Sequence, residues 1–516
     1  MTGRDPERLA RGGIRLGLGC LGVVAIGFAL AHLLAAGHGI TTQVMTADGT
    51  PMTVFRPVRG GPAPVVVIAH GFAGSQQLMQ PFAVTLARSG YVAVTFDFAG
   101  HGRNPRPLTG NIADENGATR ALVAETARVA DKALALGDGR LALLGHSMAT
   151  DIIVRVAQIR PDVAAAVAVS LFSPAVTETS PRNLLVISGE WEAGLRREAL
   201  RVVGLASAPA VPEEGVSYGD VAAGTGRRAA VSPRAEHVSV LYNQTSLREA
   251  LSWLDMTFRR TPAPSPDLDR RGPFILLLLL GVAMLAWPLS ALLPRVAFSP
   301  AGAGLGWRRL ALPLIAPAIA TPVLLRFVPT NFLPVIVCDY LAAHFAVYGI
   351  ITAACIALRQ GGRDRRAPAL SRVGLAAGAV AMAGFSLFAI IWPIDAFVTS
   401  FVPDGPRLPL FAATLAGTLI YFLADEWLTR GQGAARGAFA ASKLAFLISL
   451  ALAVALDFQR LFFLLIIVPV IVLFFLIYGL FSAWAFRRSR HPFMAGIANA
   501  FVFAWAIAAT FPLVAR

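Results

Sequence analysis

The chain has 516 residues, of which 56% are hydrophobic, with a formal net charge of +15 and a mean hydropathy of +0.63. This hydropathy is far above that of soluble globular proteins and predicts an integral membrane protein. The positive charge comes mainly from arginines that punctuate hydrophobic segments and do not cluster with stacking aromatic residues, which excludes a nucleic-acid-binding protein.

The N-terminal region predicts a membrane anchor. Residues 1–12 carry several arginines and are expected to be cytoplasmic, and residues 13–36 form an apolar run of about 20 residues, long enough to cross a bilayer. A cleaved signal peptide is the alternative, because Ala29-Leu30-Ala31 is similar to a cleavage site, although the run is long for a signal peptide. In both cases the residues that follow are expected to be exported.

Residues 37–260 predict a water-soluble α/β domain. Short runs rich in β-branched residues alternate with amphipathic stretches, as in a sheet flanked by helices. Their unbroken apolar character favours strands buried on both faces of a mostly parallel sheet. The expected core strands are 64–69, 91–96, 141–145, 164–170 and 183–188. The block contains no cysteine, so it has no disulfide framework and no cysteine-based metal site.

Three short motifs follow the first three of these strands. His70-Gly71-Phe72 ends the first, Asp97-Phe98-Ala99-Gly100-His101-Gly102 ends the second, and Gly145-His146-Ser147-Met148-Ala149 ends the third, just before a helical stretch. A serine between small residues at a strand-to-helix turn is typical of a nucleophile elbow, in which the tight turn exposes the hydroxyl at a helix N-terminus. Alone, such a motif more often marks a structural turn.

Taken together and in this order, the motifs resemble the α/β-hydrolase family over about residues 50–258, although Ala149 replaces the glycine that usually ends the elbow. The resemblance implies that Ser147 is the nucleophile and that the backbone N–H groups of Phe72 and Met148 form the oxyanion hole. It also implies a structural, non-catalytic role for the turn at residues 97–102.

The order of the triad in this family, Ser, then acid, then His, implies the other two catalytic residues. The strand at 183–188 runs into Gly189-Glu190-Trp191-Glu192, where the family's G-x-x-D spacing falls on Glu192, with Glu190 as the alternative. Either glutamate could instead be a solvated loop carboxylate, the usual environment of this residue type. His237 precedes the last amphipathic helix of the domain, as the catalytic histidine does in the family. The resemblance implies no cofactor and no metal.

Only about a dozen residues separate the strand at 164–170 from Asn183, where many relatives insert a helical lid. We therefore expect no large lid and an open site. The expected partners are a small-molecule or lipid-like acyl substrate and membrane lipids, not nucleic acid. The sequence does not specify the oligomeric state.

Residues 261–272 are expected to form a Pro-rich linker, and residues 273–516 predict an all-α, multi-pass transmembrane domain with about eight helices. Arginine-rich loops alternate with loops that contain few arginines, so the positive-inside rule places the former in the cytoplasm and residues 37–272 outside it. The arginines at 259–260 and 270–271 lie on the side that this assignment places outside the cytoplasm, contrary to the positive-inside rule. Long translocated domains override local charge, so we keep the assignment. We expect a bacterial inner-membrane protein with a periplasmic hydrolase domain.

The sequence favours a membrane-tethered serine hydrolase that cleaves an ester, thioester or related acyl bond through an acyl-enzyme, with peptidase and acyltransferase activities as variants. The alternative is a transporter or membrane assembly protein with a regulatory or non-catalytic hydrolase-like domain. Asp339 and His344 lie at membrane depth and are functional candidates for that alternative. Asp425, Glu426 and Lys443 lie near predicted helix ends and are expected to reach the membrane surface.

Overall fold

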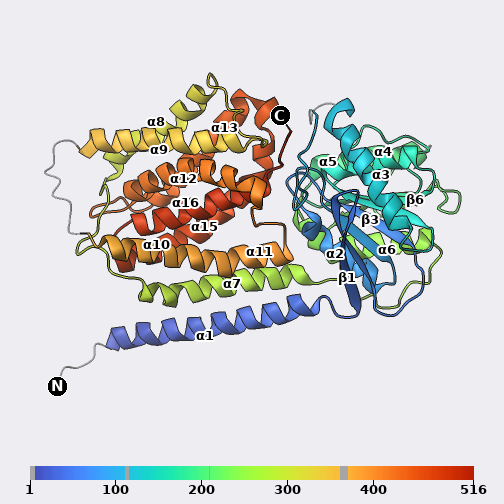
Figure 1. Cartoon of the computed structure of the whole chain (residues 1–516), viewed down its shortest axis with the longest axis horizontal. Coiled ribbons are helices and arrows are strands. Elements are labelled where there is room, and N and C mark those ends of the chain that lie inside the picture. The colour runs from blue at the N-terminus through green and yellow to red at the C-terminus, as the bar shows by residue number, and fades with distance from the viewer. Residues whose placement is uncertain (1–5, 111–114, 208–209, 361–369, 516) are drawn as a thin grey trace. The chain divides into compact units, whose positions relative to one another are not determined.

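The computed structural model of the chain describes residues 6–110, 115–207, 210–360 and 370–515. Residues 1–5 of the predicted cytoplasmic N-terminus and residues 361–369 of a predicted arginine-rich loop lie outside the described residues. The chain divides into two compact units (Figure 1). We call them the α/β unit, Phe28–Leu277 with Ile394–Ser400 and Pro512–Arg516, and the helical unit, Met1–Gly27 with Leu278–Pro393 and Phe401–Phe511.

The α/β unit is built on a nine-stranded sheet with the strand order β1-β2-β4-β3-β5-β6-β7-β9-β8. The strands from β3 to β7 and β9 pair in parallel, whereas β1, β2 and β8 pair antiparallel with their neighbours. The strands are β1 (Ile40–Ala47), β2 (Thr50–Pro57), β3 (Val65–Ala69), β4 (Val92–Phe96), β5 (Leu141–His146), β6 (Val163–Val169), β7 (Leu184–Gly189), β8 (Ser217–Tyr218) and β9 (Arg227–Ser232).

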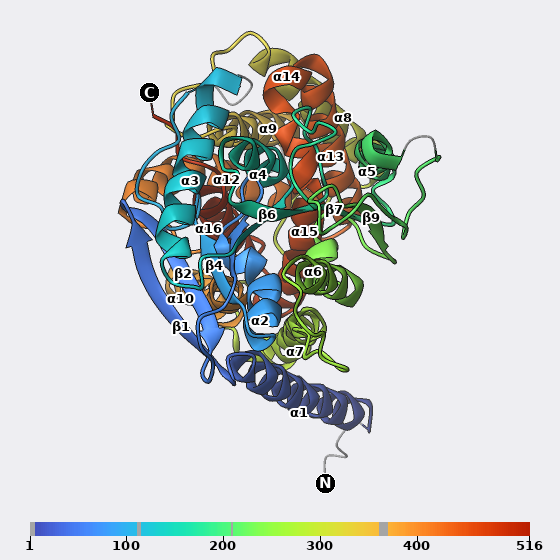
Figure 2. The same ribbon diagram turned by 90° about the vertical axis from the view of Figure 1, so that its right-hand side faces the viewer.

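Helices cover both faces of this sheet (Figure 2). α2 (Gln80–Arg88) and α6 (Gln244–Thr257) pack on one face, and α3 (Arg120–Leu134), α4 (Met148–Ile159) and α5 (Ala193–Ser207) pack on the other. Every residue of β3, β4, β5 and β7 is buried, as expected for unbroken apolar strands between two helical layers. Short helical turns are η1 (Gln76–Met79), η2 (Glu115–Thr119) and η3 (Ser239–Tyr242).

The predicted α/β fold with a mostly parallel sheet is confirmed, and the five expected strands correspond to β3–β7. Residues 170–183, all of them described, contain no helix between β6 and β7, so no large lid is inserted there. Our sequence analysis missed β1, β2, β8 and β9, although Asp48-Gly49 between β1 and β2 is a strong hairpin signal. Both residues have positive φ (47° and 83°), the conformation that a two-residue turn of this kind requires.

The helical unit contains most of the apolar helices. Nine helices within the described residues are long and apolar enough to cross a membrane, which is consistent with a membrane protein. The helices that lie wholly or partly in this unit are α1 (Pro6–Ala35), α7 (Arg271–Leu289), η4 (Ser290–Leu292), α8 (Trp307–Leu325), α9 (Cys338–Gln360), α10 (Arg372–Ser386), η5 (Leu387–Ile391), α11 (Trp392–Phe397), η6 (Gly405–Arg407), α12 (Leu408–Thr429), α13 (Ala438–Leu456), α14 (Phe458–Leu461), α15 (Phe463–Ser489) and α16 (Phe493–Thr510).

Glycines allow close helix packing in this unit. A Cβ atom on Gly22 of α1 would lie 2.8 Å from the carbonyl oxygen of Gly281 in α7, and one on Gly349 of α9 would lie 2.7 Å from the backbone of Tyr421 in α12. Only a residue without a side chain fits at either crossing. Small residues at helix crossings are typical of membrane helices, where close backbone approach supplies the packing energy.

The charged residues near the ends of α12 and α13 differ from our expectation. Asp425, Glu426 and Lys443 do not reach the membrane surface but are buried, each 6% exposed or less. The Lys443 ammonium donates to one carboxylate oxygen of Asp425, and the Ser442 hydroxyl donates to the other. Pairing the two opposite charges inside the bundle avoids the cost of placing either one alone in an apolar environment.

Candidate active site

The strand order of the α/β unit reverses direction at β3, between the carboxyl ends of β3 and β5. The chain passes from β3 to β4 on one side of β3 and then returns to β5 on its other side. In open α/β sheets, ligands bind at such a switch point, outside the carboxyl ends of the strands. The segment His70–Ser75 follows β3, and Ser147 follows β5, so both lie at this position.

Ser147 occupies a strained turn between β5 and α4. Its φ and ψ angles are 54° and −119°, a conformation that is rare for a non-glycine residue and that persists where the surrounding structure enforces it. Its N–H donates to the carbonyl of Val169 at 2.9 Å, which ties the turn to β6. Only glycine fits at position 145, before the turn, because a Cβ atom there would lie 2.8 Å from the carbonyl oxygen of Ala149. This is the geometry expected of a nucleophile elbow.

A chain of two hydrogen bonds links the three polar side chains predicted for the triad. Ser147 Oγ lies 2.9 Å from His237 Nε2, and His237 Nδ1 lies 2.5 Å from Glu192 Oε1. A carboxylate beside Nδ1 favours the tautomer in which Nδ1 carries the proton, leaving Nε2 as the acceptor for the serine hydroxyl. The arrangement can therefore remove a proton from Ser147.

The carboxylate of Glu192 is buried and well supplied with donors. Its Oε2 accepts hydrogen bonds from the Gly189 N–H at 2.7 Å and the Ser170 hydroxyl at 2.8 Å. Burial alone would raise the pKa of Glu192, but the hydrogen bonds from His237, Gly189 and Ser170 outweigh it and hold this pKa below its usual value. Of the two glutamates considered, Glu190 contacts the Arg234 N–H instead of His237.

His146, next to Ser147, supports the loop that carries His237. Its Nε2 lies 2.9 Å from the backbone carbonyl of His237, so Nε2 carries the proton and donates. Its Nδ1 is buried and has no hydrogen-bond partner among the described residues. Burial, followed by the nearby His237, lowers the pKa of His146 to about 3. The side chain is therefore neutral at physiological pH.

The loop His70–Ser75, which we call the oxyanion loop, lies against the elbow. A Cβ atom on Gly71 would be 3.0 Å from the Cβ of Ser147. The Phe98 N–H donates to His70 Nε2 at 3.1 Å, so the other ring nitrogen, Nδ1, carries the proton and donates to the Gly71 carbonyl at 2.8 Å. The Gly74 N–H donates to the same carbonyl at 3.1 Å. These bonds fix the peptide group that contains the Phe72 N–H.

The second predicted oxyanion donor is held by a different element. Met148 is the first residue of α4, so its N–H is one of the backbone groups that have no partner within the helix. The N-terminal end of a helix also carries a partial positive charge, which favours an anion nearby. Donors from the loop after β3 and from the start of α4 are the pair that an oxyanion hole of this type requires.

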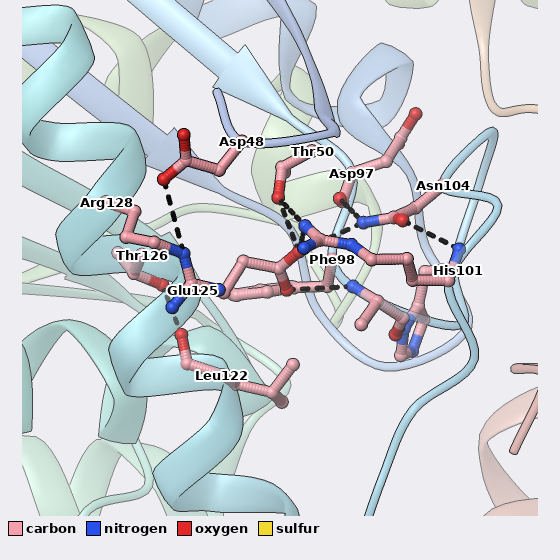
Figure 3. A network of polar contacts seen from close by, with 12 residues as sticks. Asp48, Thr50, Asp97, Phe98, His101, Asn104, Leu122, Glu125, Thr126 and Arg128 are labelled. Carbon is pink, nitrogen blue, oxygen red and sulfur yellow. Dashed lines mark hydrogen bonds and ion pairs between the residues drawn. The ribbon is translucent and has the colours of Figure 1, made fainter. Parts of the chain in front are cut away.

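The turn at residues 97–102 is held by a buried network centred on Glu125 of α3 (Figure 3). The Glu125 carboxylate accepts hydrogen bonds from the Thr50 hydroxyl at 2.7 Å, the Ala99 N–H at 2.9 Å and the Asn104 side-chain amide at 3.0 Å. Within the same turn, the Asp97 carboxylate binds the backbone and side chain of Gln76, which directly follows the oxyanion loop. The turn thus contacts the residue that follows the oxyanion loop and supports that loop.

Our sequence analysis missed three supporting residues of this site, namely Ser170, His146 as a support of the His237 loop, and Glu125. The role of Ser170 could have been predicted from the sequence. Ser170 follows β6, and the acid follows the neighbouring strand β7, so both residues lie at the same edge of the sheet. No local sequence pattern predicts the supporting role of Glu125. It lies on a helix whose other residues are ordinary for an amphipathic segment.

No three His, Cys, Asp or Glu side chains in the described part of the chain are grouped so that they could hold a metal ion. The three candidate catalytic side chains are instead engaged with one another and with neutral hydrogen-bond donors. The chemistry that this arrangement can perform with its own groups is proton transfer and nucleophilic attack.

Comparison with known proteins identifies the fold of the α/β unit. Residues 64–206 match the family model of the alpha/beta hydrolase fold. Together with the sheet order, this match identifies the α/β unit as an α/β-hydrolase domain, and the fold indicates a hydrolase in general. No curated protein was found to match the chain.

Several solved structures are similar to parts of the chain. An epoxide hydrolase from Vigna radiata is 26% identical over 26% of this chain and 40% of its own length, with a TM-score of 0.22. A thioesterase domain from the curacin biosynthetic pathway is 27% identical over 26% of this chain and 44% of its own length, with a TM-score of 0.21. A CIB-like hydrolase from Thermoplasma acidophilum is 14% identical over 42% of this chain and 97% of its own, with a TM-score of 0.31. The chain thus spans less than half the length of the first two.

Proposed function

We propose that this protein is a membrane-tethered serine hydrolase that cleaves an ester, thioester or related acyl bond. The observation that carries the proposal is the continuous hydrogen-bonded chain from Glu192 through His237 to Ser147. A serine in a strained elbow, a histidine within reach of its hydroxyl and a buried acid that orients the histidine are the parts that nucleophilic acyl transfer needs.

The proposed reaction proceeds in two steps. In the first, Ser147 Oγ attacks the acyl carbon while His237 Nε2 takes the hydroxyl proton, and Glu192 stabilises the imidazolium that forms. The N–H groups of Phe72 and Met148 bind the oxyanion of the tetrahedral intermediate. His237 then protonates the leaving alcohol or thiol, which departs and leaves an acyl-enzyme. In the second step, water attacks the acyl carbon while His237 takes a proton from it, and His237 then returns this proton to Ser147 Oγ as the carboxylic acid departs.

Exposed apolar side chains near these groups favour an apolar acyl substrate. Phe172 is 71% exposed, and its N–H binds Thr150, three residues after Ser147. Trp191 (66% exposed) directly precedes Glu192, and Val238 (42% exposed) directly follows His237. Large exposed apolar side chains next to candidate catalytic residues are suited to bind an apolar group. We propose that they contact the acyl chain of a lipid-like substrate.

We further propose that the protein lies in the bacterial inner membrane, with its N-terminus in the cytoplasm and its hydrolase domain in the periplasm. The support is the alternation of arginine-rich and arginine-poor loops between the apolar helices, read with the positive-inside rule. A reporter enzyme that is active only outside the cytoplasm, fused after Pro264, should be active. The same reporter fused after Gly433 should be inactive, and the reverse pattern would contradict this topology.

A fluorophosphonate probe tests the catalytic proposal, because it reacts only with an activated serine. The purified full-length protein should be labelled, and mass spectrometry should place the label on Ser147. Ser147→Ala should abolish labelling, and His237→Ala should lower its rate by about 10³-fold or more, because the hydroxyl then has no base. Ser180→Ala, which removes a serine hydroxyl from a loop elsewhere in the domain, serves as the matched control and should be labelled like the wild type.

The same proteins then test the substrate class with esters of increasing acyl length. We expect kcat/KM to rise with chain length, because each buried methylene adds about 0.8 kcal/mol of binding energy. Equal rates for short and long chains would argue against a lipid-like substrate while leaving the serine hydrolase in place. An unlabelled, well-folded wild type would contradict the catalytic proposal itself.

A further inference from the structure

The α/β unit contains a segment that is distant in sequence from the rest of it. Ile394–Ser400 belongs to this unit, although it includes the end of the candidate membrane span Arg372–Phe397 and precedes the span Gly405–Thr429. Three of its residues form side-chain or backbone hydrogen bonds with residues around the proposed active site. We refer to this segment as the 394–400 segment.

The first contact is with Ser75, at the end of the oxyanion loop. Ser75 Oγ accepts a hydrogen bond from the Ser400 N–H at 2.9 Å and lies 2.9 Å from the Thr399 hydroxyl. Ser75 precedes the helical turn η1, where a serine side chain ordinarily caps the helix, but it makes no such bond here. Its hydroxyl is directed to the 394–400 segment instead, and the residue is 1% exposed.

Two further contacts strengthen the attachment. The Ser400 hydroxyl donates to Gln77 Oε1 at 3.0 Å, and both residues are buried. Arg103, in the turn that follows β4, forms an ion pair with Asp395 at 2.7 Å. The 394–400 segment therefore holds both the oxyanion loop and the neighbouring turn that supports it.

The oxyanion loop needs to be held, because its backbone is strained. Ala73, between the proposed donor Phe72 and the anchored Ser75, has a φ angle of 56°. A left-handed conformation at a non-glycine residue costs on the order of 1 kcal/mol and persists only where neighbouring contacts enforce it. If Ser75 were released, Ala73 could relax, which would weaken the bond from the Gly74 N–H to the Gly71 carbonyl and loosen the peptide group that carries the Phe72 N–H.

We infer that the 394–400 segment positions the oxyanion loop for catalysis, with Thr399 and Ser400 acting through Ser75. This inference rests on the proposed function of the site. Thr399 and Ser400 do not touch the substrate, so they are positioning residues. Their effect should appear in the stabilisation of the tetrahedral intermediate and not in the binding of the ground-state substrate.

The test uses the full-length protein and the isosteric variant Thr399→Val, which removes one hydroxyl and keeps the side-chain shape. We expect kcat for a short-chain ester to fall about 5- to 20-fold, less than the 10²- to 10³-fold cost of losing an oxyanion donor outright, while KM stays within about twofold. Thr399→Ser, which keeps the hydroxyl, should restore kcat to within about twofold of the wild type.

Two measurements separate positioning from a general loss of structure. The inhibition constant of a boronic acid, which forms a tetrahedral adduct on the serine, should rise by the same factor as kcat falls. In addition, Ser75→Ala combined with Thr399→Val should be no worse than Ser75→Ala alone, because Ser75→Ala already removes the hydrogen bond that Thr399→Val breaks. Thr510→Val is the matched control, since the Thr510 hydroxyl donates to the Ala506 carbonyl of its own helix.

The outcomes distinguish this inference from the proposed function. If Ser147→Ala is inactive but Thr399→Val has wild-type kcat, the inference is wrong and the serine hydrolase stands. The inference is also wrong if kcat falls only in step with the unfolding temperature, or if Thr399→Ser does not restore it. If the wild type shows no turnover and no labelling, the proposed function fails and this inference fails with it.

Discussion

His146 lies beside the proposed nucleophile, yet its own properties are those of a structural histidine. Its Nε2–H donates to the carbonyl of His237, and its Nδ1 is buried without a partner in the described structure. Burial disfavours a positive charge on this ring and the nearby His237 adds to the effect, while Glu192 offsets it only in part, which explains why the pKa of His146 is lowered. The neutral ring therefore holds the His237 loop in place, and its protonation opposes folding.

Acid should destabilise the α/β unit through His146. Its pKa falls from 6.5 to about 3 on folding, so its contribution to stability is fully present above pH 6.5 and is lost as the pH falls toward 3. At pH 5 the loss is about 2 kcal/mol, because each pKa unit corresponds to 1.36 kcal/mol. The measurement is the temperature at which fluorophosphonate labelling is lost, recorded at about pH 7.5 and about pH 5.

His146→Gln is the comparison, because glutamine keeps a donor for the His237 carbonyl and does not titrate. The variant should lose less stability than the wild type between the two pH values. Other buried groups such as His70, whose pKa burial also lowers, contribute equally to both proteins. Equal losses in wild type and variant would show that His146 is not the group responsible.

At the scale of elements, α3 is joined to the sheet and to the turn after β4 by one carboxylate. Glu125 is 2% exposed and accepts hydrogen bonds from β2, from the turn and from Asn104 (Figure 3). Arg106 adds a partly exposed ion pair at 3.2 Å. A buried carboxylate with this many donors connects elements that hydrophobic packing alone would leave free to shift, because hydrogen bonds are directional.

Removing the Glu125 carboxylate should therefore cost more than removing an exposed one. For Glu125→Ala we expect a loss of about 3 kcal/mol in the free energy of unfolding, because several buried donors lose their acceptor. Glu198→Ala, which breaks an exposed pair with Arg201, should cost less than about 1 kcal/mol. Chemical denaturation of the two variants provides the comparison, and similar losses would contradict the role assigned to Glu125.

At the scale of the whole molecule, the α/β unit is assembled from three parts of the chain. Besides the 394–400 segment, the residues after α16 join it and run beside the loop that follows β4. The Leu108 N–H donates to the Leu513 carbonyl at 2.8 Å, the Leu513 N–H donates to the Gly100 carbonyl at 2.8 Å, and the Ala515 N–H donates to the Leu108 carbonyl at 2.8 Å. Leu108 and Leu513 are both buried. Segments from the C-terminal half of the sequence thus complete the α/β unit.

Truncation of the chain after Phe511 should destabilise the α/β unit in particular. Loss of three backbone hydrogen bonds and of the buried Leu513 side chain should cost about 3 kcal/mol. We expect fluorophosphonate labelling to be lost at a lower temperature than in the wild type. Ala515→Ser, which alters an exposed side chain and keeps the backbone bonds, is the control. An unchanged inactivation temperature in the truncated protein would show that these contacts do not stabilise the unit.

The sequence by itself determined the features that local patterns encode. Unbroken apolar runs indicated the parallel strands β3–β7, because such runs are stable only when both faces of a strand are covered. Long apolar stretches indicated the candidate membrane helices, because a bilayer requires a minimum length. The motifs around Ser147 and Phe72 identified the carboxyl ends of β5 and β3, since tight turns permit few residue types.

The tertiary structure alone decided which distant residues meet. The contact of His237 with Glu192 and not Glu190, the support of that carboxylate by Ser170, and the pairing of Lys443 with Asp425 depend on the orientation of side chains from separate elements. The attachment of the 394–400 segment and of residues 512–515 to the α/β unit has no local signal at all. Hydrogen bonds between segments hundreds of residues apart are set by how the whole chain packs, whereas a local pattern reports only the burial and backbone geometry of its own residues.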